Sequence, residues 1–148
     1  MKKLFFLALL VMGTAMTAQA QKYFTREGKI TFTSEAPVER IEATNQSATA
    51  VLDAASGRLE FAALIKAFQF EKALMQEHFN ENYMESDTYP KATFKGQIEN
   101  AASINWGKDG SYPVQVSGDL TIHGVTQKLS TAATIKITNG LPSATADF

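Results

Sequence analysis

The chain has no cysteine, and this absence excludes several kinds of chemistry. No disulfide can hold the fold together, and no thiolate can act as a nucleophile or a metal ligand. Lipid attachment through an N-terminal cysteine is excluded for the same reason. Histidine is scarce as well, with His78 and His123 as the two in the chain. Catalysis that depends on imidazole therefore has very few candidate residues.

An excess of basic charge is also lacking. The chain has 14 basic and 15 acidic side chains, and losing Lys2 and Lys3 would leave a net charge near −3. Nucleic acid binding draws most of its affinity from basic patches on phosphates, and anionic lipid surfaces attract basic segments. The charge balance argues against nucleic acid as a partner and gives no electrostatic attraction to a membrane surface.

The N-terminus carries an export signature. Lys2 and Lys3 precede an apolar run over Leu4–Met12, and the small residues Ala18 and Ala20 follow. This order predicts a secretory signal peptide over residues 1–20, cleaved after Ala20. The run is too short to span a bilayer as a helix. We therefore expect residues 21–148 to form one periplasmic or secreted domain.

Period-two alternation of apolar residues dominates the remaining chain. It is clearest over 59–65, 92–98, 112–122 and 129–137. Turn signals separate these runs at 54–57, Asp109-Gly110, His123-Gly124 and Asn139-Gly140. A change of parity near Lys66 predicts a bulge or bend there. Many short strands at hairpin spacing predict an all-β, antiparallel sandwich or barrel.

One segment interrupts this pattern. Glu71–Phe79 has no glycine, proline or β-branched residue and places apolar side chains on neighbouring helical positions. Pro90 favours extended backbone at Tyr89, so the next strand should begin about there. We expect one short helical excursion, whose carboxylates at 77, 81 and 85 form a solvated face.

Three stretches stand out together: FQFEKALMQEHFNENYMESDTYPKATFKG, GDLTIHGVTQKLS and ITFTSEAPVERIEATN. In this combination they resemble the YceI family of exported bacterial proteins. The resemblance covers nearly all of the chain after residue 20. It implies an extended lipocalin-like antiparallel barrel with an apolar lumen, and in some members a bound polyisoprenoid or quinone tail. Family chains usually continue further than Phe148, so we expect this sequence to be truncated at its C-terminus.

An apolar lumen favours a ligand that buries CH₂ groups, such as a lipid tail. We therefore interpret the helical excursion as the cap and part of the wall of a lipid-binding lumen. The expected ligand is a polyisoprenoid or other long-chain lipid, with a homodimer left open and no cofactor or metal. The candidate lipid-contacting residues are Phe68, Phe70, Leu74, Phe79, Tyr83, Met84, Tyr89, Phe94, Trp106, Leu120, Ile122 and His123.

Two alternatives remain open on the sequence. In the first, the barrel is packed solid and the protein serves exported stress-response or interaction functions. In the second, it is a metal enzyme that uses His78, His123 and a carboxylate, or a hydrolase that uses Ser86, His123 and Asp119. The sequence has no His-Glu-x-x-His, Gly-x-Ser-x-Gly or phosphate-loop motif to support the second.

Overall fold

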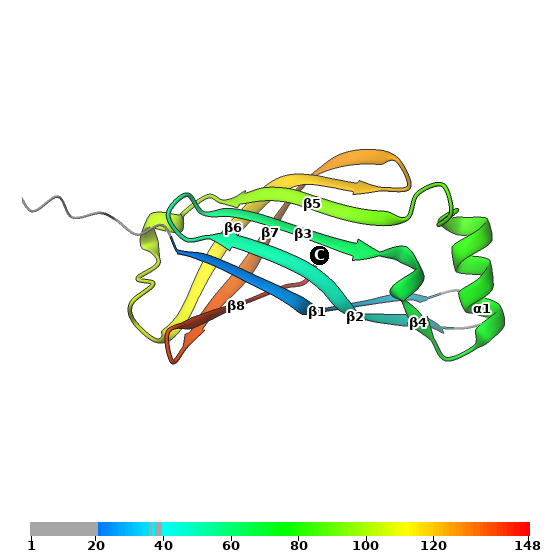
Figure 1. Ribbon diagram of the computed structural model, residues 1–148, viewed down its shortest axis with the longest axis horizontal. Helices are drawn as coiled ribbons and strands as arrows, with labels where there is room; N and C mark the ends of the chain where they lie inside the picture. The colour runs from blue at the N-terminus through cyan, green and yellow to red at the C-terminus, as the bar shows by residue number, and fades with distance from the viewer. Residues whose placement is uncertain (1–20, 36, 38–39) are drawn as a thin grey trace, which may run out of the picture.

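The computed structural model describes residues 21–148 except 36 and 38–39, so the predicted signal peptide lies outside the described residues. Long strands dominate it (Figure 1). The strands are β1 (Lys22–Glu35), β2 (Arg40–Asp53), β3 (Arg58–Leu64), β4 (Gln69–Phe70), β5 (Lys91–Ile98), β6 (Gly110–Ile122), β7 (Val125–Thr138) and β8 (Leu141–Ala146). The helical elements are η1 (Ile65–Ala67), α1 (Ala73–His78), η2 (Phe79–Tyr83) and η3 (Ala101–Ser103).

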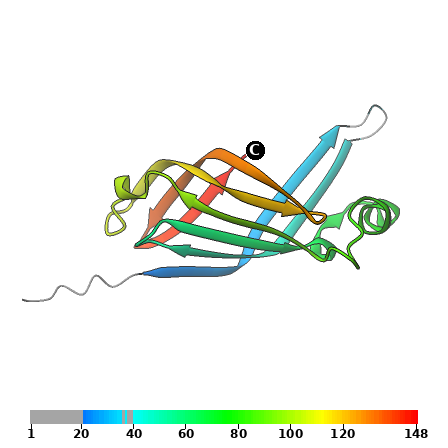
Figure 2. The same cartoon turned by 90° about the horizontal axis from the view of Figure 1, so that it is seen from above.

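All strand pairs are antiparallel, in the order β1-β2-β3-β5-β6-β7-β8, with β4 added beside β2. The sheet curls into a nearly closed barrel, which confirms the predicted all-β class. Within the described residues no ladder joins β1 to β8. Figure 2 shows the β1–β2 hairpin extending beyond the other strands at the end where α1 lies. The predicted C-terminal truncation stays a prediction.

The hairpin turns predicted at His123-Gly124 and Asn139-Gly140 are present. The one predicted at Asp109-Gly110 is wrong, because Gly110 already begins β6 and a longer connection containing η3 joins β5 to β6. His123 and Gly124 have φ values of 53° and 71°, and Asn139 and Gly140 have 52° and 79°. Positive φ at both central residues is the hairpin turn that suits the twist of the flanking strands. These turns pair β6 with β7 and β7 with β8. The predicted bend near Lys66 is the short helix η1, where β3 ends.

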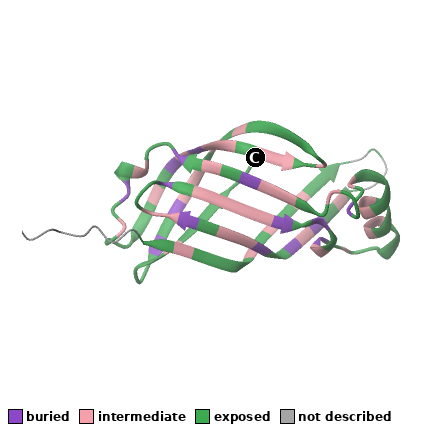
Figure 3. Ribbon diagram, turned by 45° about the horizontal axis from the view of Figure 1, so that its top comes forward, coloured by how far each residue is buried: buried purple, intermediate pink, exposed green. Residues whose placement is uncertain are grey.

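The buried side chains share one face of the sheet. Along β3, β5, β6 and β7, every position on the buried face is uncharged. Charges alternate on the other face, where Glu60, Lys95, Asp119 and Lys128 lie in register across four strands. Figure 3 shows buried and exposed residues alternating along the strands. The period-two pattern thus encodes an apolar interior and a charged exterior.

Two apolar clusters occupy the interior. The first has Phe94, Ile98, Ile135 and Ile137 among its buried members, and the second is built on Ala43, Ala48, Ala63, Ile65 and Phe68. The second cluster lies beside the helical excursion, because Phe79 and Met84 pack against it. The first receives Trp106 and Ala101 from the loops around η3, at the opposite end of the barrel.

Candidate functional site

A group of phenylalanines closes the barrel at the α1 end. Phe79 stands 5.5 Å from Phe32, 5.9 Å from Phe68 and 4.9 Å from Phe70, measured between ring centroids. These rings come from η2, β1, β4 and the residue that follows η1. Aromatic pairs at such distances stabilise beyond their buried area. The segment 71–89, here called the cap, therefore packs on this end of the barrel through Phe79.

The cap contains a π-turn that decides which of its side chains face the interior. The Met84 amide donates to the Phe79 carbonyl at 2.9 Å, a bond across five residues rather than four. In a regular α-helix, Tyr83 would lie on the same face as Phe79, because it follows Phe79 by four residues. The π-turn contains one more residue, so Met84 lies on that face instead. Tyr83 is 73 % exposed and Leu74 is 63 % exposed. Neither side chain lines the interior, and their predicted contact with a lipid stays a prediction.

Most of the remaining apolar candidates belong to one of the two interior clusters. Phe68, Phe70, Phe79 and Met84 belong to the cluster at the cap end. Phe94, Leu120 and Trp106 belong to the cluster at the opposite end, where Trp106 stacks on Tyr23 with ring centroids 6.3 Å apart. Ile122, which ends β6, is 37 % exposed and joins neither cluster.

The tip of the β6–β7 hairpin touches the cap. His123 Nε2 lies 2.7 Å from Glu85 Oε2, and the Tyr89 ring meets the His123 ring edge-on at 4.7 Å between centroids. A methyl group at Gly124 would lie 2.6 Å from the Tyr89 ring, so that ring rests directly on the turn. Glu85 has a φ of 46° and lies beyond η2, so it does not continue the predicted solvated helical face.

This contact gives His123 a carboxylate partner, but it does not build the arrangement of Ser86, His123 and Asp119. Asp119 lies beside Lys128, with 3.4 Å between Oδ1 and Nζ, on the outer face. His78 ends α1 and is exposed. Among the described residues, no group of three or more His, Asp or Glu side chains is placed to hold a metal ion.

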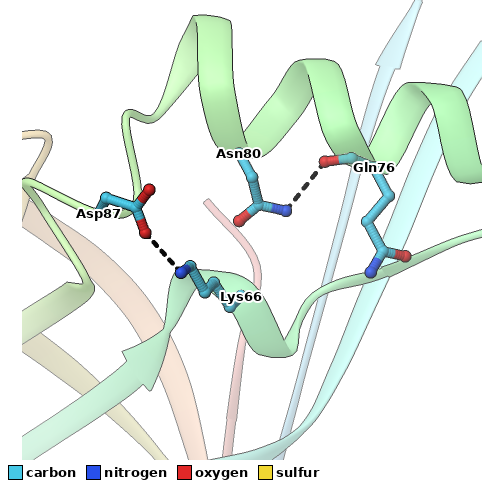
Figure 4. Close-up of polar contacts among 4 residues, drawn as sticks. All are labelled: Lys66, Gln76, Asn80 and Asp87. Carbon is cyan, nitrogen blue, oxygen red and sulfur yellow. Dashed lines mark hydrogen bonds and ion pairs between the residues drawn. The ribbon is translucent and has the colours of Figure 1, made fainter.

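A polar seam joins the cap to the chain at η1 and β4 (Figure 4). The Lys66 ammonium pairs with the Asp87 carboxylate, and the Phe70 amide donates to Gln76 Oε1 at 3.3 Å. The Lys66 hydrogen bond and charge hold the pKa of Asp87 below its ordinary value. Both groups of the ion pair are largely exposed, so solvent screens this interaction. Asn80 lies between these two links, and sequence reasoning did not single it out.

The hollows found on the protein do not coincide with the predicted lipid contacts. One shallow hollow over β2, β3 and β5 includes Phe94 in its lining but no other candidate. A second, of about 490 Å³, lies between β2, β4 and α1 and has a polar rim with Arg40, Glu42 and Glu71. In the described part of the chain, no helix is both long and apolar enough to cross a bilayer.

Comparisons with known proteins support the fold. A polyisoprenoid-binding domain from Saccharophagus degradans superposes with a TM-score of 0.66 at 14% identity, covering 80% of this chain and 68% of the other. A YceI protein of Campylobacter jejuni gives a TM-score of 0.45 at 18% identity, and this chain spans 56% of its length. Curated protein sequences yield no match. The model of the YceI-like domain matches residues 11–148, and the chain therefore belongs to the YceI-like family.

Proposed function

We propose that the barrel binds the apolar chain of a polyisoprenoid or a quinone-type lipid, in an exported, periplasmic protein that is not an enzyme. The observation that carries the proposal is the uncharged inner face of β3, β5, β6 and β7. An apolar chain loses no hydrogen bonds on entering such an interior and gains about 0.8 kcal/mol for each buried CH₂. The similar fold of a polyisoprenoid-binding domain adds support.

In this proposal, the lipid tail takes the place of contacts between side chains at the cap end of the barrel. Phe79 and Met84 close that end through packing alone, since their neighbours in the cluster are apolar. Ala43, Ala48 and Ala63, all buried there, contribute only methyl groups to the interior surface. Movement of the cap away from these alanines gives a lipid tail access to an apolar surface.

Binding is tested by titrating the purified protein with a fluorescent isoprenoid. Phe79→Asp places a charge in the apolar cap end and should weaken binding at least about tenfold, because the carboxylate must lose its hydration. Glu81→Gln, an exposed change in the same element, is the matched control and should leave affinity unchanged. The reverse ranking, or no binding by the unmodified protein, contradicts the proposal.

A second candidate function has one observation in its favour. The interior clusters are already filled by side chains such as Ile135 and Ile137, which are 0% and 2% exposed. A packed barrel of this kind suits an exported interaction protein that has no ligand. Mass spectrometry of lipids extracted from the purified protein separates the two, since a packed barrel carries no stoichiometric lipid.

A further inference from the structure

The cap buries one acceptor that has no donor. Asn80 Oδ1 is buried and receives no hydrogen bond in the described part of the chain. The other end of the carboxamide is fixed, because Nδ2 donates to the Gln76 carbonyl oxygen at 2.9 Å and a carbonyl only accepts. The unpaired atom is therefore an oxygen rather than a flipped nitrogen. A buried acceptor without a donor costs free energy, which a suitable ligand group would recover.

This oxygen lies on the side of the polar seam, one residue after the side chain that packs in the cap-end cluster. Asn80 directly follows Phe79, whose ring packs in the cap-end cluster. Its own main-chain oxygen accepts from the Ser86 amide at 2.9 Å, and Ser86 is 3 % exposed. Figure 4 shows the Asn80 carboxamide projecting from η2 toward η1, with its oxygen on the side of Lys66 and Asp87. The end of a chain seated beside Phe79 would lie close to this acceptor.

The charge around the site selects among headgroups. The cap carries Glu71, Glu77, Glu81, Glu85 and Asp87 but Lys72 as its one lysine. Lys66, the cation of the neighbouring η1, is paired with Asp87. This surplus of carboxylates repels the negative charge of a diphosphate. The Asn80 side-chain oxygen cannot donate a hydrogen bond to a diphosphate either, because it only accepts. A hydroxyl headgroup is neutral and can donate a hydrogen bond to this oxygen.

We infer that Asn80 Oδ1 accepts a hydrogen bond from the hydroxyl headgroup of the lipid, so that the site takes isoprenoid alcohols in preference to their diphosphates. The inference rests on the proposed function and specifies the ligand class of the same site. It also distinguishes the two redox forms of a quinone, because the reduced ring carries hydroxyl donors and the oxidised ring carries acceptors alone.

The test compares ligands that differ at one atom group. Geranylgeraniol, its methyl ether and its diphosphate compete against a fluorescent isoprenoid on the full chain. The ether keeps the tail and loses the donor, so the alcohol should bind about tenfold tighter than the ether. Asn80→Leu should bring this ratio to about one. Asn82→Leu, the same change at an exposed position of η2, should preserve it.

Each result decides a different claim. Equal affinity for alcohol and ether in the unmodified protein overturns the headgroup inference and leaves lipid binding standing. A preference for the diphosphate also overturns it. Failure of all three ligands to compete overturns the proposed function itself. An alcohol preference that Asn80→Leu leaves unchanged overturns the headgroup inference as well. The alcohol-to-ether comparison needs no variant, so equal affinities refute the inference even when Asn80→Leu does not fold.

Discussion

Single residues set how closely the strands approach, and Gly118 is the clearest case. It pairs with Gly96 across β5 and β6, next to the Phe94 ring. A methyl group at Gly118 would lie 2.4 Å from Gly96 Cα and 2.4 Å from the Lys95 carbonyl oxygen. Both neighbours are backbone, so neither gives way by a rotamer change. The glycine pair thus lets the two strands and the aromatic ring pack together.

Gly118→Ala should therefore lower the free energy of unfolding by about 1–3 kcal/mol, the usual cost of overpacking. The matched control is Gly107→Ala, whose added methyl would come no nearer than 3.5 Å to Asn105 Oδ1. We expect the control to stay within about 0.5 kcal/mol of the parent, as most surface changes do. Urea unfolding measures both, and equal midpoints for the two variants would refute the close-packing argument.

At the scale of elements, the cap is the part whose position depends on a few contacts. Phe79 and Met84 bind it to the interior cluster, and Tyr89 and Glu85 bind it to the tip of the β6–β7 hairpin. Segments with few buried contacts need less free energy to open locally, so the cap should open more readily than the β6–β7 ladder. If the barrel binds lipid as proposed, these few contacts make the cap end the one expected to open.

Tyr89→Ala should release the cap from the hairpin. The change removes the ring that rests on Gly124 and meets His123. Aromatic contacts of this kind contribute about 1–2 kcal/mol with their buried area, so cap amides such as Met84 and Ser86 should exchange hydrogen roughly 5- to 30-fold faster. Tyr83→Ala, at a 73 % exposed ring of the same segment, is the control. Identical exchange in both variants would show that the hairpin does not hold the cap.

For the whole molecule, the sequence predicted the sheet far better than the cap. Alternation along 112–122 and 129–137 specifies strands because each apolar residue must face the same core, and Asn139-Gly140 fixes the register. The π-turn has no comparable signal, so Tyr83 and Met84 were both predicted to contact lipid, whereas in the structure Met84 packs on the interior cluster and Tyr83 is exposed. The partner of His123 depends on a contact between distant segments, and the unpaired acceptor at Asn80 depends on how the cap packs, neither of which one-dimensional periodicity contains.

The barrel interior as a whole predicts how affinity should vary with ligand length. If the uncharged face of the sheet receives the tail, each added isoprene unit buries more CH₂ groups until the interior is filled. Thermal stability should then rise with chain length along geraniol, farnesol and geranylgeraniol, since a ligand at 100 times its Kd stabilises by about 2.7 kcal/mol. Differential scanning fluorimetry at matched ligand concentration measures the series. A solidly packed barrel would give the same Tm with all three alcohols as without ligand, because clusters around Ile135 and Phe68 would leave the tail no surface to bury.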